Sequence, residues 1–472
     1  MNSGPRAGLR ALTLRATLFA ATGDLVPYYA LYALLFADHG FGPAQISLLL
    51  ALWSATAFVF EIPSGAWADT VSRRGLLILN GILLATGFLL WTVVPSYLGF
   101  ALGFVLWGMA SALRSGTFEA LLYDELTARS ESRAYARIIG YTRSASELSA
   151  VIAILAATPL YLLGGFALVG WASVGCAVLH TALARSLPAA PRSASAAEVA
   201  ELEDSEGTEP GLDAAGPAGL TPRPRPATAD PATSGSGSIR RYLRMLRTGV
   251  SEAVRVRMVR YGVVLGALLY GITAFDEYFG LLAGEAGAAT EVVPVLVAVT
   301  VIGSLLGSLL AGRTEDMSAR TMALAVGAAA VLFGAGALIS GLALRWPGAV
   351  YVFTGLGFAA LAAAYGIVYN AGIIAEARLQ DAITGPARAT VLSVTGLGEE
   401  VVSLAVFGFV ALMTAWLSIS STLALLGISL AVIALLTPAW LPPRPRAPGT
   451  GGGIKEPKAN DGRSTADHDP GS

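Results

Sequence analysis

The sequence predicts an all-α membrane protein in which twelve transmembrane helices form two pseudo-symmetric six-helix bundles. Composition is the first observation behind this prediction. Apolar residues make up 54% of the 472 residues and charged residues only 13%, and the mean hydropathy is +0.64. A soluble chain of this length would be less apolar. The other two observations are the number of apolar runs and a polar motif that occurs once in each half.

The repeated motif places glycine, aspartate and arginine at steps of four. Its first copy lies in EIPSGAWADTVSRRG (residues 61–75), and its second in GRTEDMSAR (residues 312–320). Each copy lies between two apolar runs, so each is a short polar hinge between membrane spans. Two copies in one chain indicate a duplicated bundle. The hinge residues are Gly65, Asp69, Arg73, Arg74, Gly312, Asp316 and Arg320.

Twelve apolar runs approach the ~20 residues that are needed to cross the hydrocarbon core of a bilayer. The first run could be mistaken for a signal peptide. We interpret it as an uncleaved helix, because Asp24 and Pro27 would fall inside the apolar core of such a signal. The predicted spans are residues 12–36, 45–67, 75–94, 98–123, 138–162, 165–187, 259–282, 292–312, 321–343, 349–374, 389–413 and 416–440.

The arginines predict how these spans are oriented. Six loops on one side hold a single arginine, Arg345. By the positive-inside rule, the opposite side, with both termini and the central linker, is cytoplasmic. The four short loops on that side hold Arg73, Arg74, Arg129, Arg133, Arg137, Arg313, Arg320, Arg378 and Arg388.

Composition divides the chain into four parts. Residues 1–187 form the first six-helix bundle, and residues 188–238 form a linker rich in Ala, Pro, Gly, Ser and Glu that cannot bury a core. Residues 239–441 form the second bundle, preceded at 239–260 by a basic amphipathic segment. This segment is either a helix at the inner membrane surface or a basic lead-in that orients the seventh span. Residues 442–472 form a disordered cytoplasmic tail.

The hinge spacing G-x-x-x-D-x-x-x-R, between the second and third helices of each half, resembles the loop signature of the major facilitator superfamily. EIPSG and RSGTFEALLYDEL (residues 114–126) are similar to a bacterial branch of that superfamily. The resemblance implies a transporter of the bacterial inner membrane that works by alternating access between its two halves. It also implies that helices 1, 4, 7 and 10 line a central cavity, and that the hinges act as a gate on the cytoplasmic side.

Polar groups are costly inside a bilayer and usually face a cavity or a partner, so the intramembrane polar residues are the candidates for transport. In helix 1, Asp24, Tyr28 and Tyr32 stand at steps of four and are predicted to share one face. Asp24 is either a proton carrier or a buried acid that is hydrogen-bonded to a neighbouring helix near the Pro27 bend.

The remaining candidates for substrate binding or proton coupling lie in helices 4, 5, 7, 10 and 11. Arg143 and Glu147 lie one turn apart in helix 5 and could form either a fixed or a mobile pair. Two consecutive carboxyls in helix 11 cannot point the same way, so at most one is expected to face the cavity. The full set is Arg114, Glu119, Arg143, Glu147, Tyr270, Glu277, Tyr365, Tyr369, Asn370, Glu399 and Glu400.

Other functional classes find little support. The three histidines are far apart and form no metal motif, and one cysteine cannot form an intrachain disulfide. A net charge of −1 suggests no nucleic-acid partner. With no nucleophile, metal or phosphate constellation, we expect no enzyme activity and no cofactor.

The predicted function is proton-coupled efflux of a small organic solute by a monomer in the lipid bilayer. Aromatic side chains together with several acids suit amphipathic or cationic cargo better than phosphorylated cargo, although Arg114 and Arg143 could meet an anion. The alternatives are an uptake permease for a sugar or carboxylate metabolite, and a non-transporting sensor or scaffold that acts through the linker.

Overall fold

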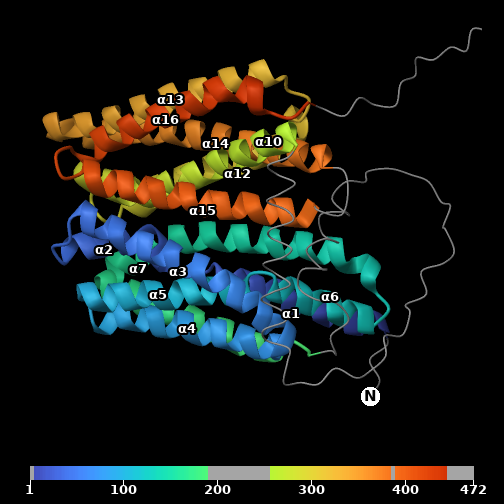
Figure 1. The fold of residues 1–472 in the computed structure, drawn as a ribbon. Coiled ribbons are helices and arrows are strands. Elements are labelled where there is room, and N and C mark those ends of the chain that lie inside the picture. Colours follow the sequence, from blue (N-terminus) through green and yellow to red (C-terminus); the bar gives the residue numbers. More distant parts are fainter. Residues whose placement is uncertain (1–4, 190–255, 384–387, 444–472) are drawn as a thin grey trace, which may run out of the picture.

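The computed structural model describes residues 5–189, 256–383 and 388–443, and within these ranges the chain folds into helices (Figure 1). The side chains of a few positions inside these ranges, Asp69 and Arg388 among them, are not described. The predicted linker, the tail and most of the amphipathic segment 239–260 lie outside the described residues. The predictions about these segments therefore remain predictions.

The first half of the chain contributes the helices that Figure 1 draws in blue to green. They are α1 (Pro5–Gly23), α2 (Tyr32–Asp38), α3 (Pro43–Thr70), α4 (Arg73–Val93), α5 (Tyr97–Arg114), α6 (Thr117–Ala128) and α7 (Tyr135–Ser186). The second half contributes the helices drawn in yellow-green to red. They are α10 (Arg257–Gly271), α11 (Phe279–Glu285), α12 (Val293–Thr314), α13 (Ala319–Leu342), α14 (Val350–Ala382), α15 (Arg388–Met413) and α16 (Ile419–Trp440).

The number of membrane spans agrees with the prediction. Eleven stretches of the described chain are long and apolar enough to cross a bilayer. One of them, Ser132–Ser186, contains two helices joined at Gly164 and Gly165, where Gly165 has a φ of 60° that a side chain would disfavour. The described chain therefore holds twelve spans, and the fold class is confirmed.

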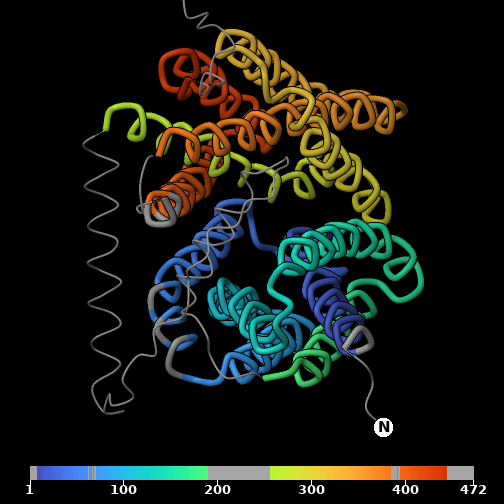
Figure 2. The backbone as a smooth tube through the Cα atoms, turned by 90° about the vertical axis from the view of Figure 1, so that its right-hand side faces the viewer, coloured from blue at the N-terminus to red at the C-terminus, as the bar shows by residue number. Residues whose placement is uncertain are grey.

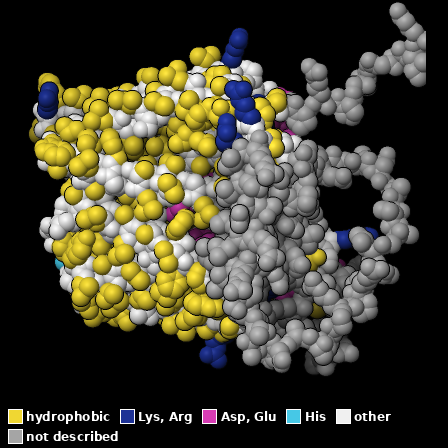
Figure 3. Space-filling view, in the orientation of Figure 1, with side chains coloured by type: hydrophobic (Ala, Val, Ile, Leu, Met, Phe, Trp, Pro, Cys, Tyr) yellow, Lys and Arg dark blue, Asp and Glu magenta, His cyan; other side chains and the backbone are white. Residues whose placement is uncertain are grey.

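The two halves lie side by side as separate groups of helices (Figures 1 and 2). Across their boundary, α3 packs against α15 and α7 packs against α12. We call the end of the bundle that carries Ser186 and Arg257 the linker end, and the opposite end the far end. Hydrophobic side chains cover most of the described surface in Figure 3, as expected for a surface in contact with lipid.

Three of the twelve spans are interrupted near the centre of the molecule. The first span stops at Gly23 and resumes through a 3₁₀ turn at Pro27–Ala30, because proline cannot continue the α-helical hydrogen-bond pattern. The fourth breaks at Gly116, which has a φ of 65°. The seventh passes through the 3₁₀ segment Ile272–Tyr278. Irregular backbone at this depth is tolerated where it lines a cavity or is buried in protein, so these breaks indicate a site.

Candidate transport site

A cavity of about 580 Å³ lies between the two halves and is bordered by all three interrupted spans. The first half contributes residues from the breaks in spans one and four, together with α3, α4 and α5. The second half contributes the 3₁₀ segment of span seven and the adjoining parts of α11 and α12. A volume of this size is typical of sites that enclose a small organic molecule.

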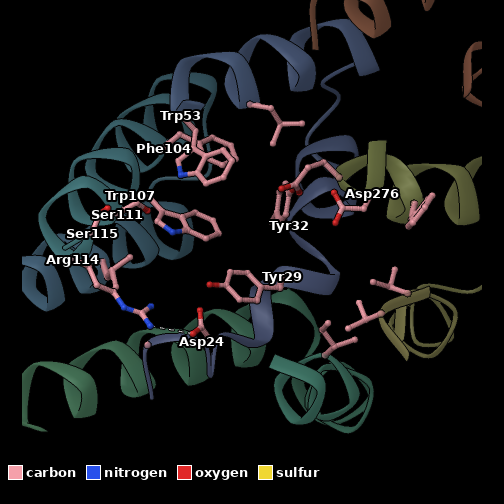
Figure 4. A pocket seen from close by; sticks show the side chains of 18 of the residues that line it. Asp24, Tyr29, Tyr32, Trp53, Phe104, Trp107, Ser111, Arg114, Ser115 and Asp276 are labelled. Carbon is pink, nitrogen blue, oxygen red and sulfur yellow. Dashed lines mark hydrogen bonds and ion pairs between the residues drawn. The ribbon is translucent and has the colours of Figure 1, made fainter. Parts of the chain in front are cut away.

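Asp24 and Arg114 form an ion pair across one wall of this cavity, with 3.4 Å between Nη2 and Oδ2 (Figure 4). Asp24 lies in the break after α1 and Arg114 is the last residue of α5. The side chains of Asp24 and Arg114 are partly exposed, at 27% and 30%. The contact agrees with the predicted bonding of Asp24 to a neighbouring helix, but the side chain is not buried as that interpretation expected. Its role as a proton carrier remains a prediction.

The prediction that Tyr28 shares a face with Asp24 and Tyr32 is wrong. Tyr28 is 1% exposed, and its hydroxyl lies 3.0 Å from that of Thr92 inside the first half. A spacing of four residues places side chains on one face only in a continuous α-helix. Here α1 ends at Gly23, and the chain then winds as a 3₁₀ turn at Pro27–Ala30. Tyr32 does line the cavity, and so does Tyr29, which sequence reasoning did not select.

Asp276 and Glu277 both line the cavity from the second half. Asp276 accepts a hydrogen bond from Tyr365 on α14 at 2.8 Å. Glu277 accepts one from Tyr32, so this bond crosses from one half to the other. The 3₁₀ winding brings two consecutive carboxyls to the same cavity, whereas sequence reasoning had selected only Glu277.

A second group of predicted residues lies on α10, α14 and α15. Tyr270 donates a hydrogen bond to Glu376 at 3.1 Å, and its ring meets that of Tyr369 edge to face. Glu400 accepts a hydrogen bond from Ser54 on α3, which is another contact between the halves. Glu399 is half-buried. Glu376 was not among the predicted residues.

Asn370 is another predicted residue that does not line the cavity. Its amide nitrogen donates to the carbonyl oxygen of Gly307 and to the hydroxyl of Thr314, both at 2.9 Å, and so joins α14 to α12. In a helix, Asn370 lies about 100° around the axis from its neighbour Tyr369 and therefore points to a different partner. Its role in substrate binding or proton coupling remains a prediction.

The remaining candidates lie near the linker end of the first half. Glu119 lines the cavity. Arg143 and Glu147 are both exposed on α7, and Glu147 lies close enough to Tyr369 to interact with it electrostatically. The predicted pairing of Arg143 with Glu147 remains a prediction.

The first hinge is anchored by a buried ion pair. Arg73 is 5% exposed, and its Nη1 lies 2.6 Å from Oδ2 of Asp124 on α6 and 2.9 Å from the carbonyl oxygen of Ala120. Arg74 donates to the carbonyl oxygen of Leu187 at 3.4 Å. The side chain of Asp69 lies outside the described residues.

The second hinge is arranged differently. Asp316 and Arg320 are exposed, and Arg378 of α14 donates to the backbone carbonyls of Glu315 and Met317. No described atom lies within 4 Å of a Cβ placed on Gly65 or on Gly312. In this conformation, therefore, no other described helix closely approaches either glycine.

An aromatic wall, which sequence reasoning did not find, faces the carboxyls of the second half. Trp107 stacks on Tyr29, with ring centroids 5.4 Å apart and planes 12° apart, and on Phe104 at 6.0 Å and 4°. Trp53 packs beside Trp107. These residues occur within apolar runs, where their pattern does not differ from that of ordinary core residues.

Comparisons with known proteins agree with this architecture. The sequence profile described as the Major Facilitator Superfamily matches residues 14–373. No curated protein matched the sequence. Among solved structures, the chain is similar to a D-xylose-proton symporter, with a TM-score of 0.58, 17% identity, and coverage of 92% of this chain and 98% of that one.

Two further solved structures are similar over nearly their whole length. The nucleoside transporter NupG has a TM-score of 0.60 and 13% identity, with 91% of this chain and 98% of that chain covered. A bacterial homologue of the human lysosomal transporter Spinster, in an inward-facing and unoccupied conformation, has a TM-score of 0.59 and 16% identity, with coverage of 93% and 96%. At these identities the likeness shows a shared fold.

Proposed function

Because the chain belongs to the major facilitator superfamily and is a membrane transporter, we propose that it exports a small organic solute in exchange for protons by alternating access. The proposed location is the bacterial inner membrane, with the linker end in the cytoplasm. The exposed arginines at that end support this orientation through the positive-inside rule; they include Arg133, Arg137, Arg313 and Arg320.

The observation that carries this proposal is the set of hydrogen bonds that join the two halves on the far-end side of the cavity. Tyr278 donates to Ser47 at 2.8 Å, and Thr158 donates to the carbonyl oxygen of Glu291 at 2.8 Å. The bond from Tyr32 to Glu277 lies deeper, at the cavity itself. Such contacts exist only while the far end is closed, so they bias the equilibrium between two conformations.

Proton coupling is assigned to Asp24. A carboxylate in a low-dielectric cavity is costly to ionise unless a cation lies nearby, and Arg114 supplies that cation here. Protonation of Asp24 would remove the charge attraction and free Arg114 to move. Because Arg114 already has this partner, it gives little support to an anionic cargo. Glu119 and Glu147 are the next candidates if Asp24 has only a structural role.

The two hinges are proposed to close the linker end in the opposite conformation. In the described conformation, Gly65 and Gly312 leave space for a neighbouring group. If the linker end closes, helices from the other half would approach these glycines, and Asp69 and Asp316 could pair with arginines there. The hinges would then stabilise the state in which the far end is open.

The test follows both ends of the molecule while the pH changes, and it requires no knowledge of the cargo. Pairs of spin labels are placed at Ala136 and Arg313 near the linker end, and at His39 and Ala289 at the far end, in a Cys176→Ser background. We expect acidification from pH 8 to pH 5.5 to change the two distances in opposite directions.

The Asp24→Asn variant fixes the uncharged state and should remove this response to pH. Glu285→Gln is the matched control, because Glu285 caps the start of α16 through the backbone NH groups of Ile419 and Ser420, away from the cavity. It should leave the response intact. Distances that stay constant, or that lengthen together at both ends, would contradict alternating access coupled to protons.

A further inference from the structure

We propose that the cavity binds a monovalent organic cation that carries aromatic rings, held between the aromatic wall and the Asp276–Glu277 pair. This inference rests on the proposed transport function and names its class of substrate. The aromatic wall consists of Tyr29, Trp53, Phe104 and Trp107.

The charge of the cavity is the first support for this inference. Its lining contains four acids and one arginine, and that arginine is engaged by Asp24. Among the described residues, no arginine or lysine lies within 4.0 Å of a carboxyl oxygen of Asp276 or Glu277. Each of these two carboxyls accepts a hydrogen bond from a tyrosine hydroxyl, which carries no charge.

Two adjacent carboxyls in a low-dielectric site can be stabilised in two ways. They can take up a proton, or a cation can bind against them, since leaving a buried charge without a partner is costly. An anion or a phosphorylated molecule would add repulsion at the same place. The carboxyl pair therefore favours a positively charged cargo over an anionic one, while proton coupling stays with Asp24.

The aromatic wall specifies what kind of cation fits. Figure 4 shows Trp107 and Asp276 on opposite sides of the cavity, with Tyr32 between them and Tyr29 below. Tryptophan has the ring face that attracts cations most strongly, and flat rings of the cargo can stack on the same surface. Small inorganic ions keep a tightly held water shell and gain little from such a wall. A weakly hydrated cation with delocalised charge gains both contacts.

The size of the cavity agrees with this choice. At about 580 Å³ it has room for a molecule of several rings. Its two chemical surfaces come from different halves, because the wall belongs to the first half and the carboxyl pair to the second. A cargo that contacts both surfaces would bind with an affinity that depends on the relative position of the halves. A transported substrate needs such a difference in affinity between conformations.

The test compares two ions of nearly the same shape and opposite charge. Purified full-length protein is incubated with radiolabelled tetraphenylphosphonium in a scintillation-proximity assay, and unlabelled tetraphenylphosphonium or tetraphenylborate is added as competitor. We expect the phosphonium to compete at least tenfold better than the borate. Equal competition by the two ions would show that the site recognises apolar shape alone and would overturn the inference.

Variants locate the binding surface. Trp107→Ala should weaken binding of the phosphonium about tenfold, and Trp107→Phe should retain most of it, because the ring face remains. The double change Asp276→Asn with Glu277→Gln should weaken binding by at least tenfold. Matched controls are Trp440→Ala, whose ring stacks on Tyr261 outside the cavity, and Glu285→Gln. If the controls weaken binding as much as the cavity variants do, the assignment of the site is wrong.

The outcomes separate this inference from the proposed function. Spin-label distances that respond to pH, combined with no binding of the phosphonium, would refute the substrate class and leave alternating access standing. Charge-selective binding in a protein whose two ends do not move would support the site and refute transport. Thermal melting of each variant shows whether a loss of binding reflects a loss of fold.

Discussion

The two hinges use different arginines. In the first hinge the motif arginine, Arg73, is buried and its guanidinium pairs with Asp124 of α6. In the second hinge the motif arginine, Arg320, is exposed, and an arginine of α14 anchors the hinge instead. That arginine, Arg378, donates to two backbone carbonyls of the hinge. Both hinges have the same Gly-Asp-Arg spacing, and both join the second and third spans of their half. The motif therefore does not determine which residue of a neighbouring helix anchors each hinge.

The difference shows what a duplicated sequence retains. The spacing of the motif is the same in both hinges, each of which joins the end of one helix to the start of the next within a few residues. The group that contacts each hinge depends on the side chains of the helix packed beside it. In the first half the neighbour offers a carboxylate, and in the second half it offers a guanidinium. In this conformation the motif arginine is buried and paired in the first hinge and exposed in the second.

The largest expected effect follows from the buried ion pair. Replacing Arg73 by alanine leaves Asp124 buried without its cation, which costs about 3–5 kcal/mol in comparable sites. The same change at Arg320, in the equivalent motif position, should alter stability by no more than about 0.5 kcal/mol, because that side chain is exposed. Thermal melting in detergent measures both changes.

A double variant sharpens this comparison. Arg73→Met combined with Asp124→Leu removes both charges and should recover much of the stability lost in Arg73→Ala, since an apolar pair can replace a buried ion pair. Equal melting temperatures for Arg73→Ala and Arg320→Ala would mean that the two motif arginines contribute equally to stability, which would contradict the comparison.

A smaller effect is expected for the second hinge. Arg378→Ala removes the charged hydrogen bonds to the carbonyls of Glu315 and Met317, and such bonds contribute about 1.5–3 kcal/mol. The loss should be smaller than for Arg73→Ala, because water can reach the exposed hinge and solvate the freed carbonyls. Arg345→Ala, at an exposed position, serves as the control. A loss for Arg378→Ala that equals or exceeds that of Arg73→Ala would reverse the comparison.

The fold could be predicted from the sequence because the hydrophobic effect acts on long runs of residues. A membrane span needs about 20 apolar residues, and every predicted span coincides with a helical stretch to within several residues. The repeated hinge added the division into two halves. Neither inference required knowledge of a side-chain contact.

The site could be predicted only in part, because it depends on breaks in the helices. Helical periodicity placed Asp24, Tyr28 and Tyr32 on one face, but the chain is not α-helical between them. The aromatic wall was missed since tryptophan and phenylalanine in an apolar run give no sign of whether they face lipid, core or cavity. The Asp24–Arg114 pair joins residues 90 positions apart, so no local pattern could reveal it.

The central claim is that one cavity is reached from each side of the membrane in turn. Ser111 lines this cavity and provides a place for a single reactive cysteine, Ser111→Cys, in the Cys176→Ser background. A membrane-impermeant maleimide is applied to oriented vesicles, first from the linker side and then from the far side. We expect labelling from both sides, with the faster reaction from the linker side.

Tyr278→Phe then shifts the balance between the two conformations. It removes the hydrogen bond to Ser47 that joins the halves at the far end, and one such bond corresponds to a change of about 2- to 10-fold in an equilibrium. Labelling of Ser111→Cys should rise by about this factor from the far side and fall from the linker side. Labelling that never occurs from the far side, or that rises from both sides together, would contradict alternating access.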